Sequence, residues 1–358
     1  MNKSTQQNEK THDLLIRHLH AYPNLQIEDI FKYLFQSAFG CEHFVPDEDA
    51  AVQYIKREFD AVPKASPPMT DRLDGEYSRV YLSHLNSGLQ AQTLARLFCR
   101  SAKKEPLGES MLEQKLQIAA AMVADGTLPF DSNVFDQKVA EWKAMGYPAV
   151  HHSDIFRATY HPAYRVVANR YAQFLQMFSK IDRLLERGNT IVAIEGGSAS
   201  GKTTLASMLQ EIYDCNVFHT DDFFLRPTQR TPQRMSEIGG NLDRERFSIE
   251  VLQPLKSGET VQFRRYDCAS QTLREPITVL PKKLTVIEGV YAMHPAFGDY
   301  YDISIFLDVA PEVQKARIKK RNTPPLARRF FEEWIPLENA YFSQMRIKSR
   351  CTESVTVE

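Results

Sequence analysis

The feature that most constrains this chain is one stretch, residues 191–205, with the sequence IVAIEGGSASGKTTL. Its four leading apolar residues, Ile191 to Ile194, are typical of a parallel strand that is buried on both faces. A glycine-rich segment follows, and apolar residues then recur with helical spacing from Leu205 to Ile212. The stretch therefore predicts a strand, a loop and a helix, in that order.

The loop between this strand and this helix fits the pattern G-x-x-x-x-G-K-[ST] without a mismatch. Glycines let successive backbone N–H groups point at one anion, and the helix that follows adds the positive end of its dipole. Lys202 is expected to reach the β- and γ-phosphates of ATP, and the Thr203 hydroxyl to bind Mg²⁺. The alternative, a turn with an incidental lysine, accounts for neither flanking element. The predicted nucleotide-binding residues are Gly196, Gly197, Ser198, Ala199, Ser200, Gly201, Lys202, Thr203 and Thr204.

Length and composition set broad limits on the class of protein. A chain of 358 residues is long enough for two domains, each with its own core. The formal charge of −1 gives no reason to expect binding to nucleic acid or to an anionic membrane. Five widely spaced cysteines without a C-x-x-C pair predict free thiols in a reducing compartment. The polar N-terminus and the lack of long apolar runs predict a cytoplasmic protein without a membrane segment.

Residues 1–187 are expected to form a mostly helical domain of unknown role, followed by a second domain over residues 188–358. Apolar spacing predicts one helix around Ile27 to Leu34 and another around Leu112 to Val123. A third predicted helix runs from Val167 to Leu185 and ends at a glycine. The proline-rich segment 62–69 between the first two helices is expected to be a loop.

Two polar clusters in this first half could be functional or structural. The segment 151–165 contains three histidines, two tyrosines and an arginine, but their spacing matches no standard set of metal ligands. Loop residues that hydrogen-bond to backbone would give the same composition. Cys41 and His43 could form a nucleophile and base only if the fold positioned them together.

A second apolar strand is predicted at Val217 to Thr220, directly before two aspartates. In doubly wound sheets, ligands bind at the carboxyl ends of the strands, so an acid at this point faces the nucleotide. Phosphorylation of an alcohol needs a carboxylate that orients and deprotonates the hydroxyl, and Asp221 is positioned for that role. The neighbouring Asp222 is predicted to cap a helix N-terminus.

Five motifs in a fixed order carry a resemblance to a known family. The phosphate loop is followed by the Asp-Asp-Phe-Phe strand end, Asn241-Leu-Asp243, Arg265-Tyr-Asp267 and Val286-Ile-Glu-Gly-Val290. Over residues 190–358 this order resembles the P-loop kinases that include uridine kinase and nicotinamide riboside kinase, with phosphoribulokinase and bacterial pantothenate kinase as more distant members. The resemblance implies an α/β fold with a doubly wound parallel sheet of the P-loop NTPase type, and it leaves the helical first half unexplained.

The resemblance also implies roles for particular residues. Asp221 would act as the base, Asp243 would hold substrate hydroxyls, and Tyr266 would flank the substrate. Glu288 ends the predicted strand 284–287, and the family implies that it completes the Mg²⁺ site with Thr203; a lone acid at this edge of a buried strand also needs a cation or solvent.

A helix is predicted to begin at Pro311, a favoured first helical position. In similar kinases this segment is a lid whose arginines close over the transferring phosphate, which would make Arg317 and Arg321 catalytic. Their spacing of one turn puts both on one face of the helix. A solvated basic surface is the alternative interpretation.

The sequence departs from uridine kinases where those enzymes contact the nucleobase. Gln271 and Leu273 stand where the family has a histidine and an arginine, so recognition of uracil is not implied. Three arginines, Arg226, Arg230 and Arg234, follow the predicted base. They suit an acceptor that carries a phosphate or a carboxylate, although an ordinary surface loop also explains them.

These observations favour an ATP- and Mg²⁺-dependent kinase that phosphorylates a hydroxyl of a small, nucleoside-like metabolite. One alternative keeps this chemistry with a non-nucleoside acid or a sugar phosphate as acceptor. Another is an ATP-dependent switch whose N-terminal half binds a macromolecular partner. Asp221 argues against the switch, because binding of ATP alone needs no acid at that position.

Overall fold

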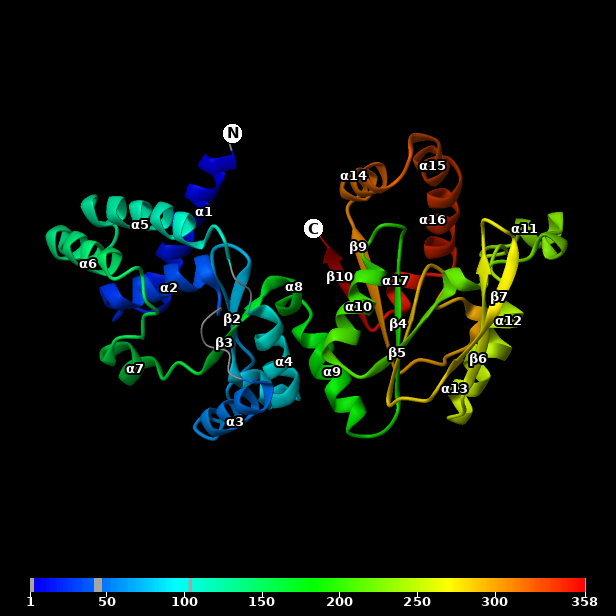
Figure 1. Cartoon of the computed structure of the whole chain (residues 1–358), viewed down its shortest axis with the longest axis horizontal. Helices are drawn as coiled ribbons and strands as arrows, with labels where there is room; N and C mark the ends of the chain where they lie inside the picture. The colour runs from blue at the N-terminus through cyan, green and yellow to red at the C-terminus, as the bar shows by residue number, and fades with distance from the viewer. Residues whose placement is uncertain (1–2, 42–46, 103–104, 358) are drawn as a thin grey trace. The chain divides into compact units, whose positions relative to one another are not determined.

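The computed structural model describes residues 3–41, 47–102 and 105–357, which form two compact units, Met1–Asp182 and Arg183–Glu358 (Figure 1). Each unit has its own sheet and its own helices. Within the described residues, no helix is both long enough and apolar enough to cross a membrane. The five cysteines are free thiols, as the sequence predicted.

The first unit combines many helices with a small antiparallel sheet, in the order β1-β2-β3. Its strands are β1 (Thr70–Arg72), β2 (Tyr77–Tyr81) and β3 (Tyr164–Ala168). Its helices are α1 (Lys3–Ala21), α2 (Ile27–Phe39), α3 (Glu48–Phe59), α4 (Ala91–Ser101), α5 (Gly108–Ala124), α6 (Ser132–Ala144), α7 (Asp154–Tyr160), α8 (Asn169–Ala172) and α9 (Leu175–Leu185). Helices α2 and α5 confirm two of the three helices predicted for this half.

The third predicted helix, over residues 167–185, is only partly correct. Val167 belongs to strand β3, where it pairs with Ser78, and α9 begins only at Leu175. The valines at 166 and 167 suit a strand as well as a helix, and the partner strand lies almost ninety residues earlier in the chain. The long-range pairing therefore decides the conformation of this segment.

The second unit is built on a parallel sheet in the order β10-β9-β4-β8-β5. Its strands are β4 (Thr190–Gly196), β5 (Cys215–His219), β8 (Leu284–Glu288), β9 (Ile303–Val309) and β10 (Glu353–Val357). The first strand, β4, lies between β8 and β9, so the crossover from β4 to β5 runs toward one edge of the sheet and the crossover from β8 to β9 runs toward the other. This confirms the predicted doubly wound α/β architecture, in which ligands bind where the strand order reverses.

Helices and a separate hairpin surround this sheet. The hairpin consists of β6 (Val261–Asp267) and β7 (Thr272–Val279), and Figure 1 shows it beside α12 and α13. The helices are α10 (Lys202–Ile212), α11 (Pro232–Ser236), α12 (Arg244–Phe247), α13 (Gln253–Ser257), α14 (Pro311–Arg321), α15 (Pro324–Arg329), α16 (Ile335–Gln344) and α17 (Ile347–Arg350). The core under the sheet includes Ala193, Ile287 and Phe306, whose side chains are buried.

The acids after β5 lie in a 3₁₀ turn, Thr220–Phe223. The predicted capping role of Asp222 is wrong, because this turn is preceded by His219 at its N-cap position and Asp222 lies inside it. The Asp222 carboxylate instead pairs with Arg265 Nε of the hairpin at 3.1 Å. A capping side chain must lie just before a helix, where backbone N–H groups are free. Asp222 lies inside the turn, and its carboxylate pairs with the hairpin instead.

Candidate functional site

The glycine-rich loop forms where strand β4 ends and α10 begins. Gly196 has a φ of +142°, and a Cβ atom at this position would lie 2.5 Å from the carbonyl oxygen of Leu307 in β9. Only glycine allows the loop to leave the sheet this close to the neighbouring strand. Helix α10 then starts at Lys202, so its N-terminus points into the loop. This is the strand, loop and helix arrangement that binds phosphate in P-loop proteins.

Lys202 and Thr203 are the two residues of the loop pattern whose side chains are expected to contact phosphate and Mg²⁺. Lys202 Nζ donates to the carbonyl oxygens of Gly196 at 2.9 Å and Gly197 at 3.1 Å. Thr203 Oγ1 donates to Glu288 Oε1 at 3.0 Å. A hydroxyl oxygen and a carboxylate oxygen therefore lie side by side at the start of α10, and these are ligands that Mg²⁺ prefers.

Asp221 lies in the 3₁₀ turn that follows β5, two residues after His219, which pairs with Glu288 of β8. Its side chain is solvent-exposed, but the surrounding protein still desolvates the carboxyl group and raises its pKa. The charge of Lys202 opposes this rise in pKa, and the carboxylate of Glu288 adds to it. The fold thus brings Lys202, Asp221 and Glu288 within electrostatic range of one another, from three different elements.

His219 also belongs to this group, although the sequence reasoning did not single it out. Its Nδ1 lies 2.6 Å from Glu288 Oε1, and this hydrogen bond raises the pKa of His219. Burial by itself would raise the pKa of Glu288, but the bond from His219 and the charge of Lys202 outweigh burial and lower it. Its position in the sequence could have indicated this role. His219 is the last residue of β5, Glu288 is the last residue of β8, and these two strands pair with each other.

The sequence reasoning also missed Glu338, a buried acid on α16. Glu338 Oε2 accepts a hydrogen bond from the backbone N–H of Ser198 at 2.8 Å, and Oε1 accepts one from the Ser198 hydroxyl at 2.5 Å. Burial raises the pKa of Glu338, and the bonds from Ser198 oppose this rise. A protein carboxylate therefore lies on a loop whose backbone N–H groups are suited to anions.

The two arginines predicted to form the lid differ in what they contact. Arg317 Nη1 donates to the carbonyl oxygen of Ala199 in the loop at 3.1 Å, and Gln314 from the same helix donates to Ser198 O at 2.8 Å. The guanidinium of Arg321 instead lies 5.5 Å from the centre of the Phe330 ring. The structure thus brings Arg317 to the loop and puts Arg321 against the segment after α15.

The predicted substrate residues, Asp243 and Tyr266, lie in a second group. Asp243 caps α12 by accepting from Arg246 N at 3.2 Å, and its other oxygen accepts from Gln229 Nε2 at 3.1 Å. The Tyr266 hydroxyl accepts from Arg230 Nη2 at 2.8 Å. Cys268, in the turn of the same hairpin, lies within electrostatic range of Asp221. Burial raises the pKa of Cys268, and the charge of Asp221 raises it further.

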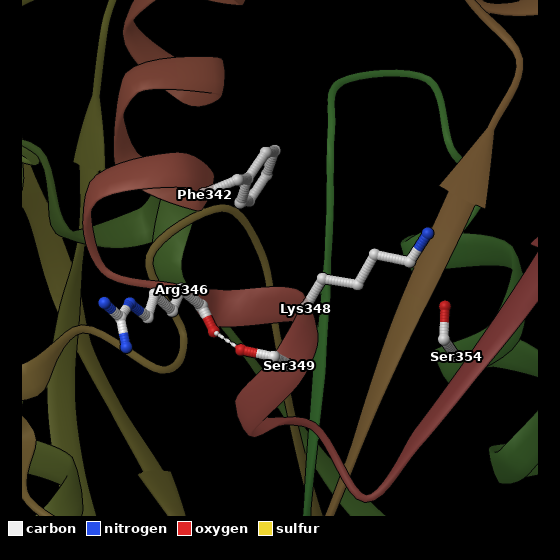
Figure 2. A pocket seen from close by; sticks show the side chains of 5 residues that line it. All are labelled: Phe342, Arg346, Lys348, Ser349 and Ser354. Carbon is white, nitrogen blue, oxygen red and sulfur yellow. Dashed lines mark hydrogen bonds between the residues drawn. The ribbon is translucent and has the colours of Figure 1, made fainter.

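A pocket of about 520 Å³ lies along α16, α17 and β10 (Figure 2). It is lined by Phe342, Arg346, Lys348, Ser349 and Ser354. None of the predicted site residues lines it. Its nearest link to the loop is Phe342, whose ring would lie 3.9 Å from a Cβ atom at Gly197.

The cysteine and histidine clusters of the first unit do not form a metal site among the described residues, which contain no group of three or more suitable ligands. Burial raises the pKa of the Cys41 thiol to about 12, which leaves it protonated and unreactive at neutral pH. His43 lies outside the described residues, so the alternative of a nucleophile and base pair is not tested.

The parallel sheet and the glycine-rich loop together define the second unit as an α/β domain of the P-loop type. Residues 191–324 match the model of the "Phosphoribulokinase / Uridine kinase family". The match confirms the family resemblance inferred from the five motifs, and it lies entirely within the second unit.

Individual relatives agree with this match. The chain is 30% identical over 144 residues to uridine kinase-like protein 3 of Arabidopsis thaliana, covering 37% of this chain and only 30% of that protein. It is 29% identical over 147 residues to the uridine kinase of Staphylococcus aureus strain JH9, covering 38% of this chain and 70% of that protein.

Two solved structures are also similar. A possible uridine kinase from Bacillus stearothermophilus has 20% identity and a TM-score of 0.38, covering 50% of this chain and 99% of that one. A putative fructose transport system kinase from Silicibacter sp. TM1040 has 23% identity and a TM-score of 0.40, covering 48% and 94%.

Proposed function

We propose that the second unit is an ATP-dependent kinase that transfers the γ-phosphate of ATP to a hydroxyl group of a small, nucleoside-like metabolite. The observation that supports the proposal is the position of Asp221, two residues after His219, which ends β5 and pairs with Glu288, and within electrostatic range of Lys202 of the phosphate loop. A protein that only binds ATP needs the loop but has no use for an acid at this point. The similarity to uridine kinases is consistent with this activity.

In this proposal each group acts on a defined atom. The backbone N–H groups of residues 196–204 and the Lys202 ammonium bind the phosphates of ATP. Asp221 orients the acceptor hydroxyl and takes its proton as the new O–P bond forms. Thr203 and Glu288 fit Mg²⁺, which would neutralise charge on the transferring phosphate. Arg317, which reaches the loop from α14, would add a positive charge on the same side.

The acceptor is proposed to be uncharged at the end where it is phosphorylated. The three arginines after Asp221 could have bound an anionic acceptor, but all three donate to groups within the protein, Arg226 to Gln229 Oε1 at 3.1 Å. Arg234 binds both oxygens of Glu245 at 2.9 Å, and Arg230 binds the Tyr266 hydroxyl. An acid or a sugar phosphate as acceptor remains the alternative, and it requires these bonds to be exchanged for bonds to the substrate.

The test is a screen of nucleosides, hydroxy acids and sugar phosphates for an ATP-dependent mass gain of one phosphate, followed by variants. We expect Asp221→Asn to bind ATP normally and to lose roughly 10²–10⁴ in turnover, because the general base is gone. Lys202→Ala should weaken both binding and turnover. Asp222→Asn is the matched control, since its carboxylate pairs with Arg265, and most of its activity should remain.

Undiminished phosphorylation by Asp221→Asn would refute the kinase proposal as stated. The switch alternative makes a different prediction, which is that ATP changes the binding of a partner to the full chain while no member of the panel gains a phosphate.

A further inference from the structure

The first unit contains a buried arginine that the kinase chemistry does not use. Arg79 is the central residue of strand β2, and its side chain is completely buried. In the antiparallel sheet it pairs with Asp71 of β1 on one side and with Val166 of β3 on the other. Charged side chains are almost never fully buried unless their hydrogen bonds are satisfied.

The hydrogen bonds of Arg79 are incomplete within the described part of the chain. Its Nε donates to Gln36 Oε1 of α2 at 2.8 Å. Nη1 and Nη2 are buried and have no hydrogen-bond partner among the described residues. The nearest carboxylate oxygen, Asp71 Oδ2, lies 3.6 Å from Nη1, and this oxygen also lacks a hydrogen bond there. The guanidinium is thus held by the hydrogen bond from Nε, while the Nη1 and Nη2 donors on its outer edge have no acceptor among the described residues.

Aromatic side chains enclose that outer edge. The Arg79 guanidinium carbon lies 5.3 Å from the centre of the Tyr33 ring and 5.0 Å from that of Tyr164. The ring of His18 packs 4.4 Å from that of Tyr33, and both of its buried nitrogens lack hydrogen-bond partners in the described ranges. The hydroxyls of Tyr22 and Tyr81 lie 2.8 Å apart, and one of them donates a hydrogen bond to the other.

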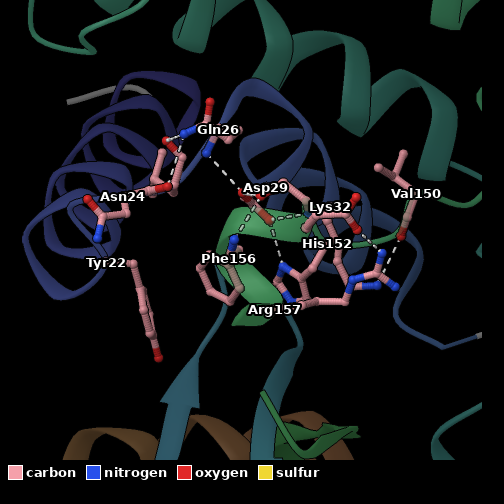
Figure 3. Close-up of polar contacts among 12 residues, drawn as sticks. Tyr22, Asn24, Gln26, Asp29, Lys32, Val150, His152, Phe156 and Arg157 are labelled. Atoms are coloured by element: carbon pink, nitrogen blue, oxygen red, sulfur yellow. Dashed lines mark hydrogen bonds and ion pairs between the residues drawn. The ribbon is translucent and has the colours of Figure 1, made fainter. Parts of the chain in front are cut away.

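A separate network holds one of these walls in position. Asp29 of α2 accepts bonds from His152 Nδ1 at 2.9 Å and from Gln26 N at 2.8 Å (Figure 3). The other nitrogen of His152 lies 2.7 Å from the Tyr164 hydroxyl, which fixes the orientation of the Tyr164 ring. Lys32 donates to the carbonyl oxygen of Val150. Asp29 and Lys32 are therefore engaged with other groups, and the carboxylate that the described residues bring nearest to the outer edge of Arg79 is that of Asp71, 3.6 Å from Nη1.

We propose that this cluster is a binding site for a small oxyanion, a carboxylate or phosphate group seated on the Nη1–Nη2 edge of Arg79. A planar guanidinium fork matches two oxygens of such a group, and aromatic walls strengthen the bonds by excluding water. Asp71, Tyr81 and Tyr164 are only partly buried, so the cluster reaches solvent on their side while Arg79 does not. The site lies entirely within the first unit and does not depend on the kinase proposal.

The test measures anion binding to the full chain by titration calorimetry, with inorganic phosphate in one arm and acetate in the other. Both are done in a Lys202→Ala background, since the phosphate loop also attracts phosphate, and chloride serves as the anion without a fork geometry. We expect phosphate, acetate or both to bind. Arg79→Lys should weaken that binding roughly ten- to a hundredfold, because it keeps the charge and removes the fork.

Arg157→Lys is the matched control, since Arg157 is an exposed arginine of the same unit that pairs with Asp154. It should bind the anion as the parent does. If Arg79→Lys does not fold, crystals of the parent chain soaked in selenate give a second readout, with an anomalous peak expected within hydrogen-bond distance of Arg79. Binding that is absent in both arms, binding that Arg79→Lys leaves unchanged, or a selenate peak at the phosphate loop alone would each overturn the proposal.

Discussion

The carboxylate of Glu338 covers one of the backbone N–H groups that make the phosphate loop an anion site. Its two oxygens bind the N–H and the hydroxyl of Ser198, and its α16 scaffold lies more than a hundred residues further along the chain. A triphosphate that approaches this loop meets a negative charge close by. We infer that Glu338 must be displaced or protonated when ATP binds.

The corresponding prediction concerns ATP affinity. Glu338→Gln removes the charge and keeps the shape, so we expect the Kd for Mg·ATP to fall by about three- to thirtyfold, as suits the loss of one nearby like charge. Titration calorimetry on the full chain measures it. Glu332→Gln is the control, because Glu332 is an exposed acid that pairs with Arg328. Weaker ATP binding by Glu338→Gln would instead make Glu338 a support of the loop.

A second prediction at this scale concerns Glu195, a fully buried acid at the end of β4. Burial raises its pKa to about 7, although Met293 N and the Tyr341 hydroxyl donate to it and oppose the rise. The folded chain therefore holds this proton more tightly than the unfolded chain, whose ordinary glutamate pKa is 4.5. The stabilisation is complete below about pH 4.5 and is lost as the pH rises to about 7.

Glu195→Gln should remove this pH dependence. We expect the difference in free energy of unfolding between the two proteins to shift in favour of the variant by up to about 3 kcal/mol between pH 4.5 and 8. Urea unfolding at both pH values measures it. A difference that stays constant with pH would mean that Glu195 is ionised in the folded chain, held so by its hydrogen bonds.

At the scale of elements, the site depends on how closely two strand ends approach. Gly289 follows Glu288 at the end of β8 with a φ of +145°, and a Cβ atom there would lie 1.8 Å from Thr220 Oγ1, next to Asp221. We expect Gly289→Ala to destabilise the second unit by roughly 1–3 kcal/mol and to reduce turnover by separating Asp221 from Glu288.

Gly188→Ala is the control for this substitution. A Cβ atom at Gly188 meets no atom within 4 Å, so its unfolding midpoint and activity should match those of the parent. Thermal unfolding and the phosphorylation assay together measure both effects. Equal behaviour of the two alanine variants would show that the strand ends can separate without cost.

The helices and strands also show which parts of the structure could be predicted from the sequence. The phosphate loop was predicted residue by residue, because its pattern is local and each residue type has one physical reason. Strands β4, β5 and β8 were predicted because buried parallel strands are continuous apolar runs. The breakdown of the predicted helix at Val167 and the wrong role of Asp222 have a common cause. In both cases a partner distant in sequence, Ser78 or Arg265, decides the local structure.

The same limit applies within the candidate site. Glu338 and Ser198 are 140 residues apart, and no local pattern relates them. Arg317 and Arg321 share a helix face by spacing, yet only the first contacts the loop, because the second lies at the end of α14 beside Phe330. Periodicity predicts which side chains share a face but not how far along the helix the partner extends.

At the scale of the whole molecule, the interactions described for the phosphate loop come from within the second unit. They involve β4, β8, α14 and α16, all after residue 187. Most of helix α9 lies in the first unit, and its Asp182 bonds there, accepting from Gln90 N at 2.7 Å and from Thr93 Oγ1 at 2.9 Å. A boundary at residues 187 and 188 would leave α9 intact and begin the second domain just before β4.

We therefore expect residues 188–358 alone to fold and to bind Mg·ATP with a Kd within about threefold of that of the full chain. Circular dichroism and calorimetry measure these two properties. A fragment that folds but does not bind ATP would mean that the first unit completes the nucleotide site. The turnover of the fragment, compared with that of the full chain, distinguishes two roles for the first unit. All residues that the proposed chemistry assigns lie within the fragment. Full turnover by the fragment would leave the first unit a role outside catalysis, such as anion binding at Arg79. Lost turnover with intact ATP binding would mean instead that the first unit contributes to holding the acceptor.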